Sequence, residues 1–313
     1  IRMGTGIAVS FARSPATLAY TAWDLAAQSN GRFILGLGTQ VRPHIERRFG
    51  MDWPASVTGK LREQIQVMRA LWDTWQTGAP LNFRGQYYKI TLMSPFFNPG
   101  PIPPPIFDEV QSQMGGQRGA TFDASQSKTG GPRGAAPPIY IAGVNTRLAK
   151  LAGELCDGFL VHPFHTLDYL RQVLLPAIQE GAHKTGRERR EIEISASVFA
   201  ASNLQEREYC RQQISFYAST PSYRPVMALH GWGEVAEKLS SLAARGEWQD
   251  MPSLIDDKIL TTFVTEADTP SALADALKAR YRGLADRLTL YTPFLPGERD
   301  SWWRDLTAQF ASS

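Results

Sequence analysis

Polar residues that could bind or catalyse follow one short apolar segment near the amino terminus. The segment 33–37 is apolar and lies between Gly31 and Gly38, which is typical of a strand buried on both faces of a parallel sheet. The polar residues that follow it are Thr39, Gln40, Arg42 and His44. Ligands of parallel α/β folds bind at the carboxyl ends of strands, so this pattern favours a site. An ordinary polar loop is the alternative.

Two histidines have positions that suit catalysis. An imidazole can accept or donate a proton near neutral pH, and His44 lies in the loop just described. His162 directly follows the expected strand 159–161 and precedes Pro163, so it is expected to face a site. For His44, a hydrogen bond to the backbone in a structural loop is the alternative. The three remaining histidines are interpreted as structural: His165, His183 and His230.

A second candidate site lies in the turn between the expected strand 139–142 and the expected helix 146–155. Gly143, Val144 and Asn145 lie at this turn, where free backbone amides and the helix dipole suit a phosphate. Gly143 allows the backbone to approach a ligand, and Arg147 could add positive charge. A plain tight turn is the alternative, because glycine is common in such turns.

Hydroxyl groups are dense in the segment FYASTPSYRP, which follows an expected helix. They belong to Tyr217, Ser219, Thr220 and Tyr223. This loop could form one wall of a substrate pocket. Ser219, Thr220 and Pro221 could instead cap the helix and begin the next turn.

Strands and helices alternate along the chain, which predicts an α/β fold with a parallel sheet, either a closed barrel or an open doubly wound sheet. Strands are expected at 1–10, 33–38, 139–142, 159–161, 191–200 and 288–291. Helices are expected at 15–30, from Lys60 onward, and at 146–155, 167–182, 205–217, 233–245 and 270–282. Aromatic residues around Arg84-Gly85 predict a small hairpin.

Composition excludes several classes of protein. The 313 residues include 33 basic and 30 acidic residues, and this small, dispersed excess does not predict a nucleic-acid partner. Two cysteines, Cys156 and Cys210, give neither a disulfide framework nor a metal-ligand spacing, so no metal is expected and a cytoplasmic location is favoured. No apolar run is long enough to span a bilayer, so no membrane association is expected.

One segment does not resemble the rest. Residues 108–136 are rich in Gly, Gln and Ser with few large apolar residues, so a flexible insertion is expected there within a single domain spanning 1–313.

The order of the motifs resembles the luciferase-like monooxygenase superfamily, specifically its oxidoreductases that depend on the deazaflavin coenzyme F420. The motifs are MGTGIAVSFARSPATLAYTAWDLAAQSNGRFILGLGTQ, the FRGQYY hairpin and PPIYIAGVNTRLAKLAGELCDG. The segments GLGTQVRPHIERRFGMDW and SFYASTPSYRPVMALHGW resemble one subgroup. The resemblance therefore covers nearly the whole chain.

This resemblance implies a TIM-type (β/α)8 barrel with the cofactor across the carboxyl ends of its strands. It implies a non-proline cis peptide at Gly6-Ile7 beneath the deazaflavin ring, with Thr5 beside it. Thr39 and Gln40 would border the ring system, and the phosphate would bind at the turn 143–147.

Two departures from the family limit what the resemblance implies. Val41 and His44 stand where relatives commonly carry Glu and Asn. The first strand of this sequence matches the third strand of the family, so two strand-helix units are expected to be missing.

The leading functional hypothesis is an oxidoreductase that transfers hydride between coenzyme F420 and a small organic substrate. A monooxygenase that uses flavin mononucleotide (FMN) is the alternative, and an inactive cofactor-binding fragment is a third hypothesis. A metal-dependent hydrolase is least favoured, because no histidine or carboxylate pair has ligand spacing at a strand end. A homodimer is possible, since dimers are the commonest assemblies.

Overall fold

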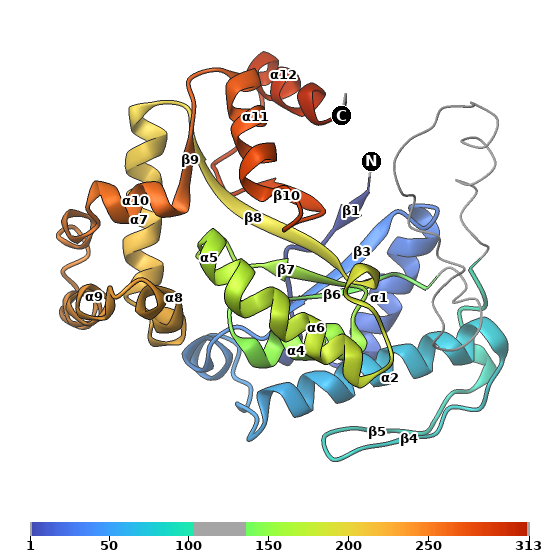
Figure 1. Ribbon diagram of the computed structural model, residues 1–313. Helices are drawn as coiled ribbons and strands as arrows, with labels where there is room; N and C mark the ends of the chain where they lie inside the picture. The colour runs from blue at the N-terminus through green and yellow to red at the C-terminus, as the bar shows by residue number, and fades with distance from the viewer. Residues whose placement is uncertain (1, 103–135, 312–313) are drawn as a thin grey trace. The chain divides into compact units, whose positions relative to one another are not determined.

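A computed structural model of the chain describes residues 2–311 except 103–135 (Figure 1). The described residues form two compact units, each built from separate stretches of the chain. The first unit contains 1–142, 151–158 and 181–192, and the second contains 143–150, 159–180 and 193–313. Almost all of the expected insertion, 108–136, lies outside the described residues.

Parallel strands form the sheet of the first unit. They are β1 (Met3–Gly4), β2 (Ala8–Val9), β3 (Phe33–Gly38) and β6 (Ile139–Gly143). Both β1 and β2 pair with β3, whose other edge pairs with β6. Every residue of β3 is buried, as its unbroken apolar run predicts for a central parallel strand.

Two helices pack together in the first unit through tryptophans. Helix α1 (Pro15–Gln28) begins as expected, with the Ser14 hydroxyl accepting a hydrogen bond from the amide of Ala16. Helix α2 (Val57–Thr77) contributes Trp72, whose indole N–H donates to the carbonyl of Ala19 at 3.1 Å. Trp72 and Trp75 are both buried, so they belong to the core of this unit.

Other elements of this unit match the expected pattern. The hairpin consists of β4 (Phe83–Arg84) and β5 (Lys89–Ile90), which pair antiparallel. A turn before β7 (Gly158–Val161) fixes the start of β6: the Asp157 carboxylate accepts the Ile139 amide at 2.8 Å, and the Asp157 amide donates to the Ile139 carbonyl.

The strands of the second unit are organised around one long strand, β8 (Glu193–Ala201). Strands β9 (Val264–Glu266) and β10 (Arg287–Leu290) both pair with it in parallel. Asp286 repeats the arrangement of the first unit, because its carboxylate accepts the amide of Ile194 at 2.7 Å. The two aspartates thus fix the register where each strand begins.

Further helices alternate with and follow the strands from β6 onward along the chain (Figure 1). They are α4 (Thr146–Leu155), α5 (Leu167–Tyr169), α6 (Leu175–Lys184), α7 (Leu204–Ala218), α8 (Arg224–Leu229), α9 (Gly233–Arg245), α10 (Asp257–Phe263), α11 (Pro270–Tyr281) and α12 (Asp300–Ala311).

The structure corrects some expected boundaries. The single strand expected at 1–10 is two short strands with a break at residues 5–7. The helix expected at 167–182 is α5 and α6 joined by a wider π-helical turn at 170–174. Strand β9 and the helices α8 and α10 were not expected, because short elements give too few residues for a periodic pattern. The twelve-residue helix α12 was not expected either.

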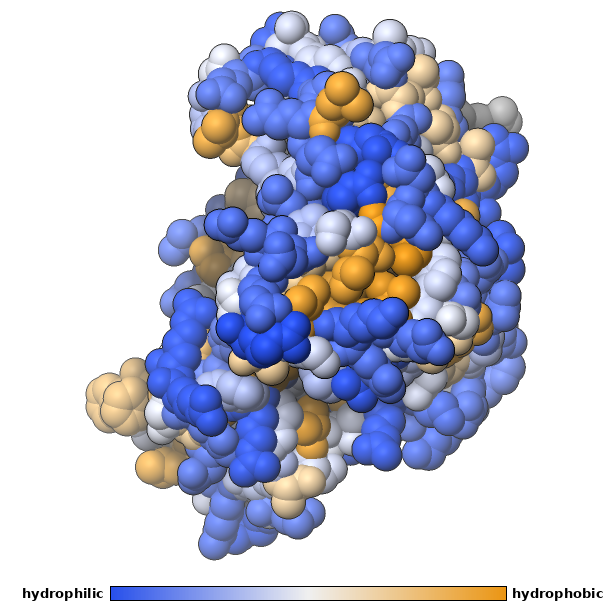
Figure 2. Space-filling model, turned by 90° about the vertical axis from the view of Figure 1, so that its left-hand side faces the viewer, coloured by the Kyte–Doolittle hydropathy of each residue, from blue (hydrophilic) through white to orange (hydrophobic). Residues whose placement is uncertain are grey.

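The surface turned toward the viewer in Figure 2 is mostly hydrophilic, with a group of hydrophobic residues near its centre. Within the described ranges, no helix is long and apolar enough to cross a lipid bilayer.

Candidate functional site

The break in the first strand is built around Thr5 and a cis peptide. The bond Gly6-Ile7 is cis, as the family resemblance implied. The Thr5 hydroxyl donates to the carbonyl of Gly36 at 2.7 Å and accepts the amide of Gly36 at 3.0 Å. In the gap between β1 and β2, this side chain therefore replaces backbone pairing with β3, and its hydroxyl is used within the sheet.

The end of β3 lies against this break. A Cβ at Gly38 would come within 2.6 Å of Ile7 Cδ1, so only glycine allows the Ile7 side chain to lie there. Thr39 is buried and its hydroxyl donates to the Gln40 carbonyl at 3.2 Å. Gln40 has a φ of 58° and an exposed side chain with no hydrogen-bond partner among the described residues. The structure thus places Ile7, Thr39 and Gln40 around one strand end.

The turn at the end of β6 presents free donors at the start of α4. The Asn145 side chain accepts the Leu148 amide at 3.0 Å and so caps the helix. The backbone amides of Val144 and Asn145 donate to no atom of the described residues. Arg147 is exposed in the first helical turn and pairs with no carboxylate of the described chain. Such a turn can bind an anion.

Two contacts hold this turn in place. The Tyr169 hydroxyl donates to the carbonyl of Val144 at 2.9 Å, and burial raises the pKa of that hydroxyl. A Cβ at Gly143 would approach Leu148 Cβ to 2.9 Å, so the strand and the helix fit together only with glycine there. The sequence had not indicated Tyr169, because its α5 position lies 25 residues after Val144.

His162 lies directly after β7, where the sequence predicted it, and it is largely enclosed by aromatic rings. Its Nδ1 accepts the amide of Phe164 at 3.1 Å, and its Nε2 lies 3.2 Å from the Tyr223 hydroxyl. Its ring stacks on Tyr223 and meets Tyr217 edge-on, both at 4.7 Å between centroids. Burial, followed by the neighbouring His165, lowers the pKa of His162 to about 3.

Two of the residues predicted to form the pocket wall therefore meet a predicted catalytic residue. The Tyr217 hydroxyl also bonds the hydroxyl of Tyr291, which follows β10. Burial raises the pKa of Tyr223 to about 12, and burial together with the Tyr291 hydrogen bond raises the pKa of Tyr217 further. The sequence analysis missed Tyr291, because it took this residue as the last of the expected strand 288–291, whereas β10 ends at Leu290.

The other two residues of that segment lie at the end of α7, where only the Ser219 hydroxyl makes a hydrogen bond among the described residues. The Ser219 hydroxyl donates to the carbonyl of Phe216 at 2.7 Å, and the Ser219 carbonyl accepts the Ser240 hydroxyl at 2.6 Å. The Thr220 amide donates to the Tyr217 carbonyl at 3.0 Å, which continues the turn. The capping alternative considered for the sequence describes the local geometry of Ser219.

The remaining histidines differ in their surroundings. His44 is exposed, and its ring has no hydrogen bond or ring contact among the described residues. His165 is buried, with Nδ1 on the His162 carbonyl at 2.8 Å and Nε2 on the Tyr281 hydroxyl at 3.2 Å. His230 bonds Thr166 through Nε2 at 2.8 Å, and His183 is exposed near the end of α6.

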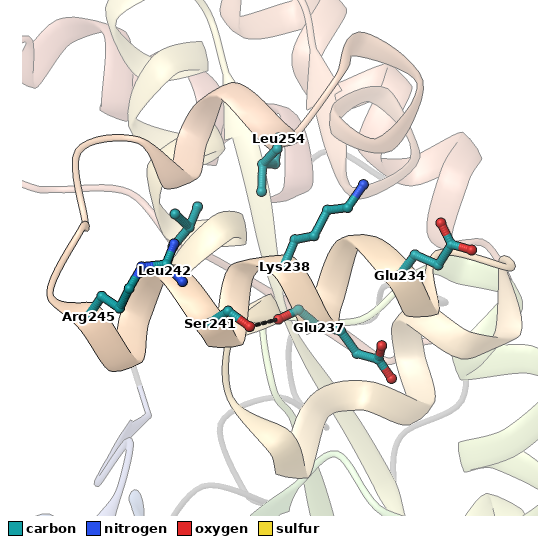
Figure 3. Close-up of a pocket in the computed structure, with 7 residues that line it drawn as sticks. All are labelled: Glu234, Glu237, Lys238, Ser241, Leu242, Arg245 and Leu254. Atoms are coloured by element: carbon teal, nitrogen blue, oxygen red, sulfur yellow. Dashed lines mark hydrogen bonds between the residues drawn. The ribbon is translucent and has the colours of Figure 1, made fainter.

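Other surfaces offer less for chemistry. Within 2–102 and 136–311, no group of three or more His, Cys, Asp or Glu side chains could hold a metal ion. Figure 3 shows a surface hollow along α9, to which Leu254 contributes from a neighbouring turn. Its charged side chains, Glu234, Glu237, Lys238 and Arg245, are of both signs, and the hollow contains no predicted site residue.

Comparison with known sequences identifies relatives over most of the chain. The family described as luciferase-like monooxygenase matches residues 1–287. An uncharacterized protein of Mycobacterium tuberculosis, Rv1360, is 38% identical over 296 residues, which covers 92% of this chain and 77% of that protein. An F420-dependent glucose-6-phosphate dehydrogenase of Nocardia farcinica is 30% identical over 191 residues, covering 60% of this chain and 46% of that protein.

A solved structure shares the fold. The coenzyme F420-dependent tetrahydromethanopterin reductase of Methanopyrus kandleri superposes with a TM-score of 0.69 at 19% identity, covering 99% of this chain and 81% of that chain. The expected α/β fold of the luciferase-like TIM-barrel type is therefore confirmed.

Proposed function

The chain belongs to the luciferase-like monooxygenase family, and within it we propose an oxidoreductase that moves hydride between coenzyme F420 and a small organic substrate. The observation that carries this proposal is the free-amide turn at 143–147 in a chain whose named relatives include F420-dependent enzymes. The bound deazaflavin would supply the hydride chemistry, and the protein would supply binding and orientation.

The turn residues suit the phosphate of this cofactor. The unpaired amides of Val144 and Asn145 provide donors, and the dipole of the ten-residue helix α4 favours negative charge beside them. Arg147 adds a cation that no described carboxylate neutralises. Tyr169 holds the turn through the Val144 carbonyl, so the donors are arranged before a ligand arrives.

The residues around the end of β3 are proposed to contact the ring system. Gly6 is exposed and has no atom within 4 Å of its Cβ position, so that side of the cis peptide is open to a flat ligand. Thr39 and Gln40 follow the same strand end. Thr5 would contribute indirectly, because its hydroxyl is engaged by Gly36.

The two predicted catalytic histidines would have different roles. A pKa of about 3 keeps His162 neutral at physiological pH, so it would act there as a hydrogen-bonding group and not as an acid. His44 is exposed without a partner in the described part of the chain, so its ring is available to contact a ligand.

Two matched variants on α4 test the cofactor site. Arg147→Gln and Lys150→Gln each remove one positive charge, but Arg147 lies in the first turn and Lys150 pairs with Glu180 at 2.7 Å. We expect Arg147→Gln to weaken F420 binding about threefold to tenfold, measured by equilibrium titration, because a charged hydrogen bond is lost.

The control and the salt dependence complete this experiment. Lys150→Gln should bind F420 within about twofold of the unaltered protein, and added salt should weaken binding of the unaltered protein more than that of Arg147→Gln. Equal effects of the two substitutions would place the phosphate elsewhere.

A further inference from the structure

All four polar groups of His162 are engaged within the second unit. Its amide donates to the Gly143 carbonyl at 3.5 Å, and its carbonyl accepts from His165 Nδ1 at 2.8 Å. Its Nδ1 accepts from the Phe164 amide at 3.1 Å. A nitrogen that accepts a hydrogen bond carries no proton, so the neutral ring has its proton on Nε2. This ring is held in one orientation and one tautomer.

That tautomer sets the role of Tyr223. His162 Nε2–H donates to the Tyr223 oxygen across 3.2 Å, which leaves the hydroxyl hydrogen of Tyr223 free to donate. No atom of the described residues accepts that hydrogen. In the neighbouring pair of Tyr217 and Tyr291, one hydroxyl donates to the other. The hydroxyl that accepts keeps its own hydrogen, which has no acceptor in the described chain. The cluster therefore offers donors to an oxygen atom.

The surroundings of these hydroxyls are aromatic and uncharged. Phe164 lies 5.7 Å from Tyr223 between ring centroids, and Tyr217 lies 5.7 Å from it as well. Among the described residues, no Lys or Arg lies over any of these rings. Burial lowers the pKa of His162 to about 3 and raises that of Tyr223 to about 12, so neither ionises near neutral pH.

We propose that Tyr223 donates a hydrogen bond to a carbonyl or alcohol oxygen of an uncharged substrate, and that His162 positions Tyr223 for this contact. The proposal rests on the oxidoreductase function proposed above, because it names the class of substrate for that reaction. An ionic substrate such as a phosphate ester would find no fixed cation in this cluster.

Two probes of similar size separate the substrate classes. Acetophenone carries a neutral carbonyl on an aromatic ring, and phenyl phosphate carries an anionic group on the same ring. We expect acetophenone to bind at least tenfold more tightly, measured by ligand-detected NMR titration of the full chain. Tighter binding of phenyl phosphate, or no binding of acetophenone, overturns the proposal.

Substitution at Tyr223 tests the hydrogen bond itself. Tyr223→Phe keeps the ring but removes the donor, so acetophenone should bind about threefold to tenfold more weakly, as for one neutral hydrogen bond. Tyr87→Phe is the matched control, because that hydroxyl accepts the amide of Ser56 in the hairpin region. It should change binding less than twofold. An unchanged affinity in Tyr223→Phe refutes the contact.

A double-mutant cycle separates positioning from a merely structural role. His162→Ala should weaken acetophenone binding as much as Tyr223→Phe, and the double variant should be no weaker than Tyr223→Phe alone. His162→Gln keeps an N–H near the position of Nε2, so it should restore most of the affinity. Additive losses, or no recovery with Gln, would contradict positioning through Tyr223.

The same proteins distinguish this proposal from the function on which it rests. Tyr223→Phe should bind coenzyme F420 as the unaltered protein does. If F420 binds equally but acetophenone binding does not depend on Tyr223, the substrate proposal fails alone. If no variant binds F420 while the acetophenone results hold, the oxidoreductase proposal fails and the Tyr223 contact stands.

Discussion

The buried His165 makes a specific prediction about stability and pH. Its side chain is 2% exposed, and burial followed by the positive charge of Arg280 lowers its pKa to about 4, despite its hydrogen bond to the His162 carbonyl. In the unfolded chain a histidine has a pKa of about 6.5. As pH falls below that value the unfolded state binds a proton that the folded state does not, so His165 makes the protein lose stability on acidification.

The size of this loss follows from the difference between the two pKa values. At about 1.4 kcal/mol per pH unit, a difference of about 2.5 units gives roughly 3 kcal/mol once titration is complete. Between pH 7 and pH 5 the expected part is about 2 kcal/mol. His165→Asn removes the titrating group but keeps an N–H that can donate to the His162 carbonyl. This variant should lose about 2 kcal/mol less over the same interval.

Urea unfolding at both pH values measures the effect. Other groups titrate equally in the two proteins, so the comparison isolates His165. The control is His183→Asn, which removes an exposed imidazole near the end of α6 and should keep the pH dependence of the unaltered protein. If His165→Asn loses as much stability on acidification as the unaltered protein does, the argument from burial is refuted.

Four further substitutions probe elements that hold the fold. Gly143→Ala puts a Cβ within 2.9 Å of Leu148 and should cost about 1–3 kcal/mol in urea unfolding, with unchanged stability as the contradicting result. Ser14→Ala removes the N-terminal cap of α1, and Asn203→Ala removes that of α7; each should lower the free energy of unfolding by about 1 kcal/mol. Unchanged stability in both variants would show that these caps do not stabilise the fold. Burial raises the pKa of Glu154, but hydrogen bonds from Arg62 and Lys184 outweigh burial, so the pKa is lowered overall. Glu154→Gln should therefore cost about 1–3 kcal/mol in urea unfolding at pH 7, and less as pH falls through the folded pKa of the carboxyl. A cost that stays constant at every pH would contradict this.

Local sequence patterns predicted the elements that position the site. The buried run before Gly38 predicted β3, and Gly143, the last residue of β6, predicted the turn that presents free amides. His162 was found because it follows an apolar strand, and its place after β7 is confirmed. Each of these features depends on residues that are adjacent in the chain, which is why the sequence alone could reveal them.

Contacts between distant residues could not be predicted in this way. The hydrogen bond between His162 and Tyr223 joins residues 61 positions apart, and that between Tyr217 and Tyr291 joins residues 74 apart. The hydrogen bonds by which the Thr5 hydroxyl replaces backbone pairing with β3 also depend on the register of β1, β2 and β3. Only the folded chain shows which side chains of a hydroxyl-rich segment meet a histidine and which cap a helix.

The choice of cofactor is the central claim, and a parallel equilibrium titration with coenzyme F420 and FMN tests it most directly. Both carry a phosphate that suits the turn at 143–147, so only their relative affinities separate the deazaflavin oxidoreductase from a flavin monooxygenase. We predict a dissociation constant for F420 at least tenfold lower than for FMN. Tight binding of FMN without detectable binding of F420 would contradict the account.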